Sequence, residues 1–272
     1  MKSNRYANWA IQLLVWLGAA LMLFPLYLTV TVALKKSGEG GNIMTFPKEI
    51  YFGNFKQAIE LGRYFEGLLN STFITVISLF LIILFGASTA YGISRSRSKS
   101  SRFLYYFFIS GMFVPFQVLM LPLLKQISAV GLLNKYGVIL LYTTYSLFQS
   151  VFLYTGYLKS IPKELEEAAQ VDGYGPFRLF WKIIFPLLKP MTATLIILNT
   201  IWIWNDFLLP LVMLSDPGEY TLPLLQYVFQ TQYSTDFSLA FASYLLVMLP
   251  ILLVYSGLQK YIINGIVSGA VK

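Results

Sequence analysis

The sequence contains no cysteine and no histidine, and only 12% of its 272 residues are charged. Without cysteine the chain has neither a disulfide framework nor a thiolate metal site, and without histidine it lacks the usual general base and the commonest zinc ligand. An ordinary soluble domain carries about 25% charged residues. A chain that is 57% hydrophobic therefore has too little polar surface to cover itself in water, and we predict a non-catalytic membrane protein.

The sequence also lacks the phosphate-binding loop G-x-x-x-x-G-K-[ST], whose backbone N–H groups cradle the phosphates of a nucleotide. If the chain takes part in ATP-driven work, a separate subunit must bind the ATP and its Mg²⁺. No carboxylate pair or metal-ligand cluster stands out from the pattern, so we expect no cofactor in this chain.

The main feature that the sequence does contain is a series of long apolar runs. Each meets the requirement of roughly 20 residues for a helix that crosses the hydrocarbon core, and helices satisfy their own backbone groups in lipid. The sequence thus predicts an all-α membrane protein, a single domain over 1–272 with six transmembrane helices. The runs are Ala10–Leu34, Leu68–Ile93, Phe103–Leu124, Gly137–Leu158, Pro190–Leu214 and Phe237–Leu258. Prolines inside the runs could kink these helices, namely Pro25, Pro115, Pro122, Pro210 and Pro250.

The positions of lysine and arginine predict the orientation of the six helices. If the N-terminus is cytoplasmic, thirteen of the 20 basic residues lie on the cytoplasmic side, including the dense cluster Arg95–Arg102. Positive loops stay inside, so both termini are expected in the cytoplasm. The net charge of +8 is then explained by this topology and by anionic inner-leaflet lipid, and no nucleic-acid partner is expected.

One cytoplasmic segment, 159–189, is longer than a connection between two helices requires. Pro162 suits the first turn of a short helix, Glu164, Glu166 and Glu167 offset its dipole, and Gly173 suits a left-handed residue after its end. A second helix is expected over Pro176–Phe185. A solvated helix–turn–helix is one interpretation; a docking surface for a cytoplasmic protein is the interpretation that we favour.

The same segment carries a motif. Glu167-Ala168-Ala169, Gly173 and Ile183-Ile184-Phe185-Pro186 fit the pattern E-A-A-x(3)-G-x(9)-I-x-L-P except for Phe185. This resembles the EAA loop of permease subunits of binding-protein-dependent ABC importers. The resemblance implies that the loop contacts an ATPase through Glu164, Glu167, Ala168, Ala169, Asp172, Gly173, Ile183 and Pro186.

Further stretches resemble the shorter permease of maltose-type carbohydrate importers. They include Val114-Pro115-Phe116-Gln117, Trp204-Asn205-Asp206-Phe207 and the tail after Gly265. The resemblance implies a type I (MetI-like) bundle in a prokaryotic cytoplasmic membrane, paired with a second, different permease, two ATPase subunits and an external sugar-binding protein. It also implies that the outer loop 215–236 touches the binding protein and that the cytoplasmic tail 259–272 reaches the ATPases through Gly265, Ser268, Gly269 and Val271.

Polar residues inside the apolar runs are candidates for a translocation path. Asp206 is the one charged residue well inside a run, and Thr192, Asn199 and Asp206 recur at intervals of seven, so they share one helical face. The candidates are Gln117, Tyr142, Tyr145, Gln149, Asn199, Asn205 and Asp206. The alternatives are hydrogen bonding between helices and, for Asp206, a place at the membrane interface.

Taken together, the sequence predicts the permease of an ATP-driven importer of a carbohydrate, a di- or oligosaccharide. The alternative is a stand-alone secondary transporter or channel in which Asp206 is the ion or proton site.

Overall fold

The structure is a computed structural model that describes the backbone of residues 5–36, 42–233 and 236–270, and the side chains of residues 9, 11–36, 42–233 and 236–257. Every regular secondary-structure element in these ranges is helical, as predicted. The chain divides into two units, Met1–Phe65 with Leu225–Pro250 and Glu66–Leu224 with Ile251–Lys272, and each has its own internal packing.

The described helices provide between four and six membrane spans, depending on how two bent helix pairs are counted. Four helices are long and apolar enough to cross a membrane alone, and two bent pairs raise the number to six if each pair is one span. The single helices contain Ile11–Ala33, Tyr64–Arg95, Lys135–Leu158 and Phe237–Gly257. The pairs are Lys99–Gly111 with Phe116–Ala129, and Pro176–Leu187 with Lys189–Asn205.

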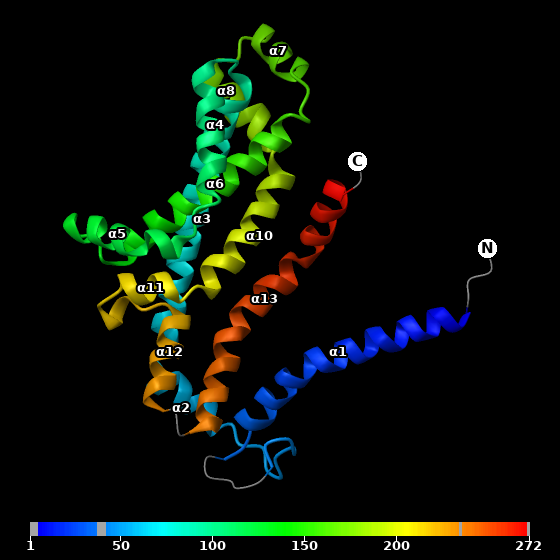
Figure 1. Cartoon of the computed structure of the whole chain (residues 1–272), viewed down its shortest axis with the longest axis vertical. Helices are drawn as coiled ribbons and strands as arrows, with labels where there is room; N and C mark the ends of the chain where they lie inside the picture. Colours follow the sequence, from blue (N-terminus) through cyan, green and yellow to red (C-terminus); the bar gives the residue numbers. More distant parts are fainter. Residues whose placement is uncertain (1–4, 37–41, 234–235, 271–272) are drawn as a thin grey trace. The chain divides into compact units, whose positions relative to one another are not determined.

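Helix α6 (Lys135–Leu158) is central to the second unit, where it contacts α4, α10 and α11 (Figure 1). Small residues allow these helices to approach closely: a Cβ on Gly86 of α3 would lie 2.9 Å from the Cβ of Ser150 on α6. The other helices are α3 (Tyr64–Arg95), α4 (Lys99–Gly111), α5 (Phe116–Ala129), α7 (Glu164–Val171), α8 (Pro176–Leu179), α9 (Phe185–Leu187), α10 (Lys189–Asn205) and α11 (Leu208–Met213).

The third apolar run does not form one continuous helix, contrary to the simplest expectation. Helix α4 ends at Gly111, α5 starts at Phe116, and their axes differ by 105°. Pro115 at the break has φ −64° and ψ 136°, an extended conformation, and proline disfavours helical geometry in the residue before it. Of the prolines expected to bend a span, Pro115 marks this break.

The fifth run is also interrupted, and its helix ends at Asn205 rather than Leu214. Asp206 has ψ 128°, which is outside the helical region, and its carboxylate Oδ1 accepts a hydrogen bond from the N–H of Leu208 at 3.0 Å. The side chain thus satisfies one of the backbone donors at the start of α11, so the chain ends one helix and begins the next.

The first unit contains α1 (Arg5–Ala33), α2 (Gly53–Leu61), most of α12 (Leu222–Gln232) and the first part of α13 (Phe237–Ala270). Asn54 closes the end of α1, since its Nδ2 donates to the carbonyl oxygens of Ala33 at 2.8 Å and Lys35 at 2.7 Å. A small cluster of Ala58, Phe229 and Leu239 forms the core of this unit.

Candidate coupling surface and polar cavity

Segment 159–189 forms two helical stretches at one end of the second unit, as predicted (Figure 1). Helix α7 stops where Gly173 takes a left-handed conformation with φ +80°. The N–H of Gly173 donates to Gln170 and that of Tyr174 donates to Ala169, so the last carbonyls of α7 are satisfied. The second stretch begins at Pro176 and includes a π-helical turn, Phe180–Ile184.

A buried ion pair anchors α7 to the bundle. Arg95 Nε, at the end of α3, lies 2.6 Å from Oε1 of Glu166, and the hydroxyl of Tyr91 donates to Oε2 at 3.1 Å. Arg95 also donates to the carbonyl oxygens of Leu158 and Ile161. Because Glu166 is only 7% exposed and both of its oxygens are engaged, α7 is held to α3 and to the end of α6 by charge-assisted bonds. Glu166 is a structural residue that the sequence motif did not single out.

An apolar core lies beneath the same helix. Ala169 is buried with Leu158, Leu179 and Ile184, and Ile183 packs against this core from its edge. Ala169 therefore contacts its own chain, whereas its neighbour Ala168 is exposed. The two alanines of the motif have different surroundings although they are adjacent in sequence.

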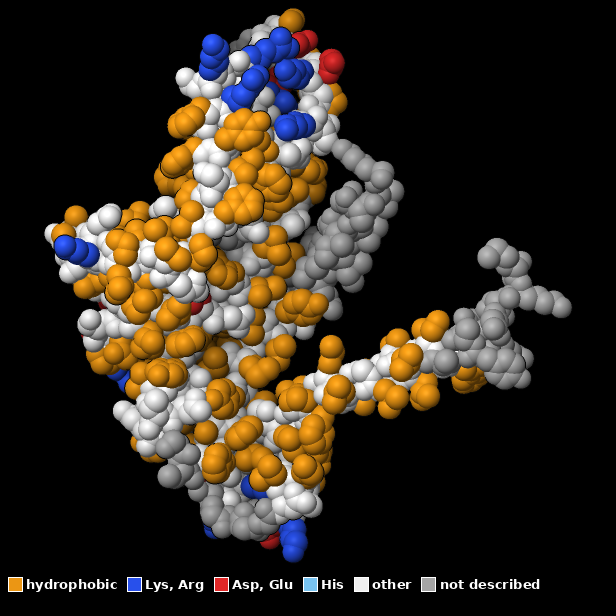
Figure 2. Space-filling view, viewed as in Figure 1, with side chains coloured by type: hydrophobic (Ala, Val, Ile, Leu, Met, Phe, Trp, Pro, Cys, Tyr) orange, Lys and Arg blue, Asp and Glu red, His pale blue; other side chains and the backbone are white. Residues whose placement is uncertain are grey.

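The opposite face of α7 is open to solvent. It combines acidic and apolar side chains, and Val171 is 88% exposed. The predicted coupling residues on the exposed surface are Glu164, Glu167, Ala168, Asp172, Gly173 and Pro186. Basic side chains gather at the same end of the unit (Figure 2), among them the exposed residues Arg97, Lys99, Arg102, Lys159 and Lys163.

Three predicted path residues line one cavity of about 370 Å³ between the end of α4, α6 and α10. They are Tyr145, Gln149 and Asn199, and Ser146 and Trp202 line the same space. Among the described residues, the Tyr145 hydroxyl and the Ser146 Oγ have no hydrogen-bond partner. Buried polar groups are usually paired, so these two atoms are available to a ligand or to water.

The remaining path candidates lie elsewhere. Tyr142 donates to Asp206 Oδ2 at 2.9 Å, and its ring meets that of Trp202 edge-on, with centroids 5.3 Å apart. Asp206 thus has both oxygens engaged, one by α6 and one by the start of α11. Asn205 donates to the Ile201 carbonyl oxygen, and Gln117 is exposed on α5.

The three residues predicted to share one helical face, at intervals of seven along α10 and its end, therefore have different roles. Thr192 forms a 2.8 Å hydrogen bond with the Tyr154 hydroxyl of α6, and Asp206 bonds to Tyr142 of α6. These two residues join helices, as the alternative interpretation expects. Asn199, between them and 2% exposed, lines the cavity.

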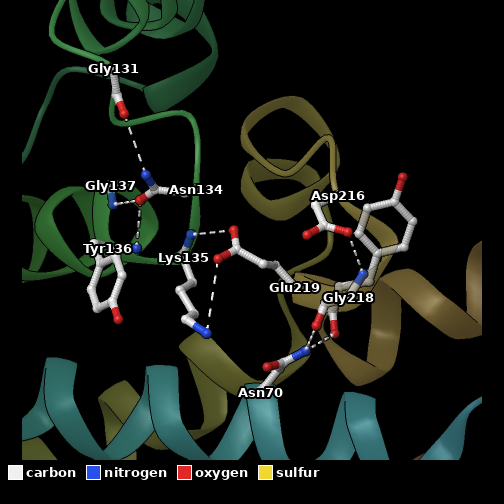
Figure 3. A network of polar contacts seen from close by, with 10 residues as sticks. Asn70, Gly131, Asn134, Lys135, Tyr136, Gly137, Asp216, Gly218 and Glu219 are labelled. Atoms are coloured by element: carbon white, nitrogen blue, oxygen red, sulfur yellow. Dashed lines mark hydrogen bonds and ion pairs between the residues drawn. The ribbon is translucent and has the colours of Figure 1, made fainter.

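A polar network ties the turn at residues 216–220 to the helices of the same unit (Figure 3). Glu219 accepts from the backbone N–H of Lys135 at 3.1 Å and lies 3.9 Å from its Nζ. Asn70 of α3 donates to the carbonyl oxygens of Gly218 and Tyr220. Asn134 caps α6 by accepting from the N–H groups of the first turn. This turn, the first part of the loop 215–236, is therefore held in a defined conformation against α3 and α6.

The predicted tail residues Gly265, Ser268, Gly269 and Val271 belong to a region in which the structure describes no side chains. The backbone is helical through Ala270. The contacts expected of the tail stay a prediction.

Comparison with known proteins identifies the family. The profile of "Binding-protein-dependent transport system inner membrane component" matches residues 82–267, which include α7, the ion pair and the cavity. The chain belongs to this family. It is thus a multi-pass membrane protein, as its spans indicate.

Relatives within the permease family are named for sugar transport. The multiple sugar-binding transport system permease protein MsmG of Streptococcus mutans serotype c is 45% identical over 281 residues and covers 100% of both chains. The melibiose/raffinose/stachyose import permease protein MelC of Bacillus subtilis is 36% identical, over 96% of each chain. The recognition of a carbohydrate ABC importer permease from the sequence is confirmed.

The fold agrees as well. A chain of the crystal structure of a bacterial ABC transporter involved in the import of the acidic polysaccharide alginate superposes with a TM-score of 0.83 at 22% identity, covering 96% of this chain and 98% of that chain. The MetI-like fold expected of a permease of this family is thereby confirmed.

Proposed function

We propose that this permease is the membrane-spanning subunit of an ATP-driven importer of a di- or oligosaccharide in the cytoplasmic membrane of a prokaryote. The observation that carries the proposal is the geometry of α7, which is fixed to its own bundle by Glu166 and Arg95 on one side and exposed on the other. The names of the sugar-transport relatives support the substrate class.

The proposed assembly contains a second, different permease, two cytoplasmic ATPase subunits and an external sugar-binding protein. The family description, with its dependence on a binding protein, supports the last of these partners. ATP and Mg²⁺ belong to the ATPase subunits in this proposal. The fixed outer loop around Glu219 is the surface proposed to meet the binding protein.

The proposed mechanism is alternating access driven through α7. When the ATPase dimer closes, force on the exposed face of α7 passes through the Glu166–Arg95 pair to α3 and through the apolar core around Ile184 to α6 and α10. A contact transmits motion only if it is stiff on both sides. The charge-assisted bonds and the buried core supply that stiffness on the permease side.

The proposed sugar contact in this subunit is the cavity lined by Tyr145, Gln149, Asn199 and Trp202. Ring faces suit the C–H surfaces of a sugar, while amide and hydroxyl groups can bond to its hydroxyls. An ion or proton site at Asp206 is less well supported, because both carboxylate oxygens already accept hydrogen bonds from the chain.

The test is ATP-dependent uptake of labelled raffinose by the complete complex in liposomes. The variant Glu167→Arg reverses a charge on the exposed face of α7, and Glu49→Arg makes the same change at an exposed position of the first unit. We expect Glu167→Arg to lower ATPase co-purification and uptake by about tenfold or more, which corresponds to a loss of about 1.4 kcal/mol of binding free energy. Glu49→Arg should leave both unchanged.

Two results would overturn the proposal. One is full assembly and transport by the Glu167→Arg complex. The other is uptake by the purified chain without ATP or any partner, which would indicate a secondary transporter instead.

A further inference from the structure

A second cavity, also of about 370 Å³, lies where α3 ends, α4 begins and α6 ends. Three cationic side chains line it, those of Arg97, Arg102 and Lys159, and no carboxylate does. Four serines at the end of α3, in the short connection and in the first turn of α4 add hydroxyl groups: Ser94, Ser96, Ser98 and Ser101. This combination of guanidinium, ammonium and hydroxyl donors suits a phosphate group.

No carboxylate of the described residues neutralises the cationic groups of this cavity. Among the described residues, neither Arg97 nor Arg102 forms an ion pair, and Lys159 lies 5.6 Å from the centre of the Tyr105 ring rather than beside a carboxylate. The neighbouring Arg95 differs, since Glu166 and two carbonyl oxygens engage it. Within the basic segment Arg95–Arg102, Arg95 is thus engaged by the fold, whereas Arg97 and Arg102 line the cavity with unpaired charges.

A buried polar atom in the cavity wall is an independent sign of a ligand. Thr155 of α6 lines the cavity, is only 3% exposed, and its Oγ1 has no hydrogen-bond partner among the described residues. A buried hydroxyl is normally paired with protein or with an ordered ligand or water. The wall therefore holds a donor that the chain itself does not use.

The surroundings of the cavity favour a lipid as the source of the phosphate. The cavity lies at the ends of spans, where headgroups are found, and large apolar side chains of α4 are exposed just beyond it, including Phe103, Tyr106 and Phe107. A headgroup in the cavity would leave its acyl chains beside this apolar surface. We infer that the cavity binds the phosphate headgroup of an anionic phospholipid; a free phosphate ion is the other source of the same chemistry.

The test measures lipid retained by the full chain in nanodiscs. The chain is reconstituted in phosphatidylcholine with or without phosphatidylglycerol, and bound phosphatidylglycerol is counted by native mass spectrometry after release. We expect the parent to retain phosphatidylglycerol and the double variant Arg97→Gln/Arg102→Gln to retain about tenfold less or lower still, because both removed charges face the cavity. Arg97→Lys/Arg102→Lys, which keeps the charge, should retain most of it.

The matched control is Lys182→Gln/Lys189→Gln, which removes two exposed charges near the same end of the unit outside the cavity wall. Thr155→Val is a milder variant, expected to weaken retention with an unchanged circular dichroism spectrum.

Equal loss in the control, or full retention by Arg97→Gln/Arg102→Gln, would overturn the inference. So would displacement of the lipid by millimolar inorganic phosphate, which would assign a free ion, or loss of ATPase association without loss of lipid, which would assign a protein interface. The deciding readout here is retained lipid, which the uptake and co-purification test of the proposed function does not measure, so the inference and the proposed function can fail separately.

Discussion

At the scale of single residues, adjacent glutamates of α7 have opposite surroundings. Glu166 is buried against Arg95 and Tyr91, while Glu167 is exposed. The motif in the sequence points to Glu167, yet the residue that holds the helix in place is its neighbour. Substitutions at these two positions should therefore separate anchoring from docking.

Glu166→Ala should destabilise the permease, and Glu167→Ala should not. Removing Glu166 leaves the guanidinium of Arg95 in a largely buried site without its anion, which costs about 2–4 kcal/mol. An exposed side chain contributes within about 0.5 kcal/mol. Thermal unfolding in detergent, followed by circular dichroism, measures the difference. Equal unfolding temperatures for the two variants would show that the pair contributes nothing to the folded state.

Asp206 is expected to act as a helix-joining residue rather than as a titrating site. Asp206→Asn keeps an amide oxygen that can accept from Tyr142, and we expect it to retain most of the ATP-dependent uptake. In a double-mutant cycle, Tyr142→Phe and Asp206→Ala should show a coupling of about 1–2 kcal/mol, since one charged hydrogen bond joins them. Loss of uptake by a well-folded Asp206→Asn variant would instead indicate an ion or proton site.

At the scale of elements, the end of α7 depends on one backbone conformation. Gly173 has φ +80°, and no heavy atom lies within 4 Å of the place where its Cβ would be. A side chain is therefore disfavoured by backbone strain alone, by about 1–2 kcal/mol. We expect Gly173→Val to lower the unfolding temperature and ATPase association, and Gly173→Asn to be milder, because asparagine tolerates the left-handed region. Gly175→Ala, two residues on in open space with φ −68°, is the control; an equal effect there would remove the conformational explanation.

The spans were predictable from sequence, but their interruptions were not. Twenty apolar residues in a row predict a helix because lipid leaves the backbone no other partner. Four of the six runs lie within single helices, and the third and fifth form helices with a break. The breaks depend on details that hydropathy does not measure. Pro115 has no backbone N–H to donate to a helix, and Asp206 has a carboxylate that accepts from the first N–H of the next helix. Asp206 and Tyr142 were both candidates from the sequence, but their hydrogen bond depends on how α6 packs beside the end of α10 and could not be predicted.

At the scale of the whole molecule, two signals in the sequence led to two candidate surfaces. The motif pointed to segment 159–189, and polar residues inside the apolar runs included three that line one cavity. Tyr145 and Gln149 are one helical turn apart on α6 and line the same cavity, whereas Tyr142, another candidate on this helix, bonds to Asp206 instead. Asn199 comes from another helix, and its place beside them depends on how α10 packs on α6. The phosphate-binding cavity at Arg97 was not predicted as a site, since a basic cytoplasmic segment is already explained by topology.

The cavity at Tyr145 allows a test of where this subunit contacts its cargo. Gln149→Ala should lower ATP-dependent uptake of raffinose by about two- to tenfold, because one hydrogen bond to a sugar hydroxyl contributes about 0.5–1.5 kcal/mol. ATPase activity in the absence of sugar should not change, since α7 and its anchor lie in another part of the unit. Thr144→Ala is the control on the same helix, because Thr144 is exposed, bonds only to the Leu140 carbonyl oxygen and is outside the cavity wall. If Gln149→Ala and Thr144→Ala transport equally well, the sugar does not touch this cavity and the partner permease must supply the contact.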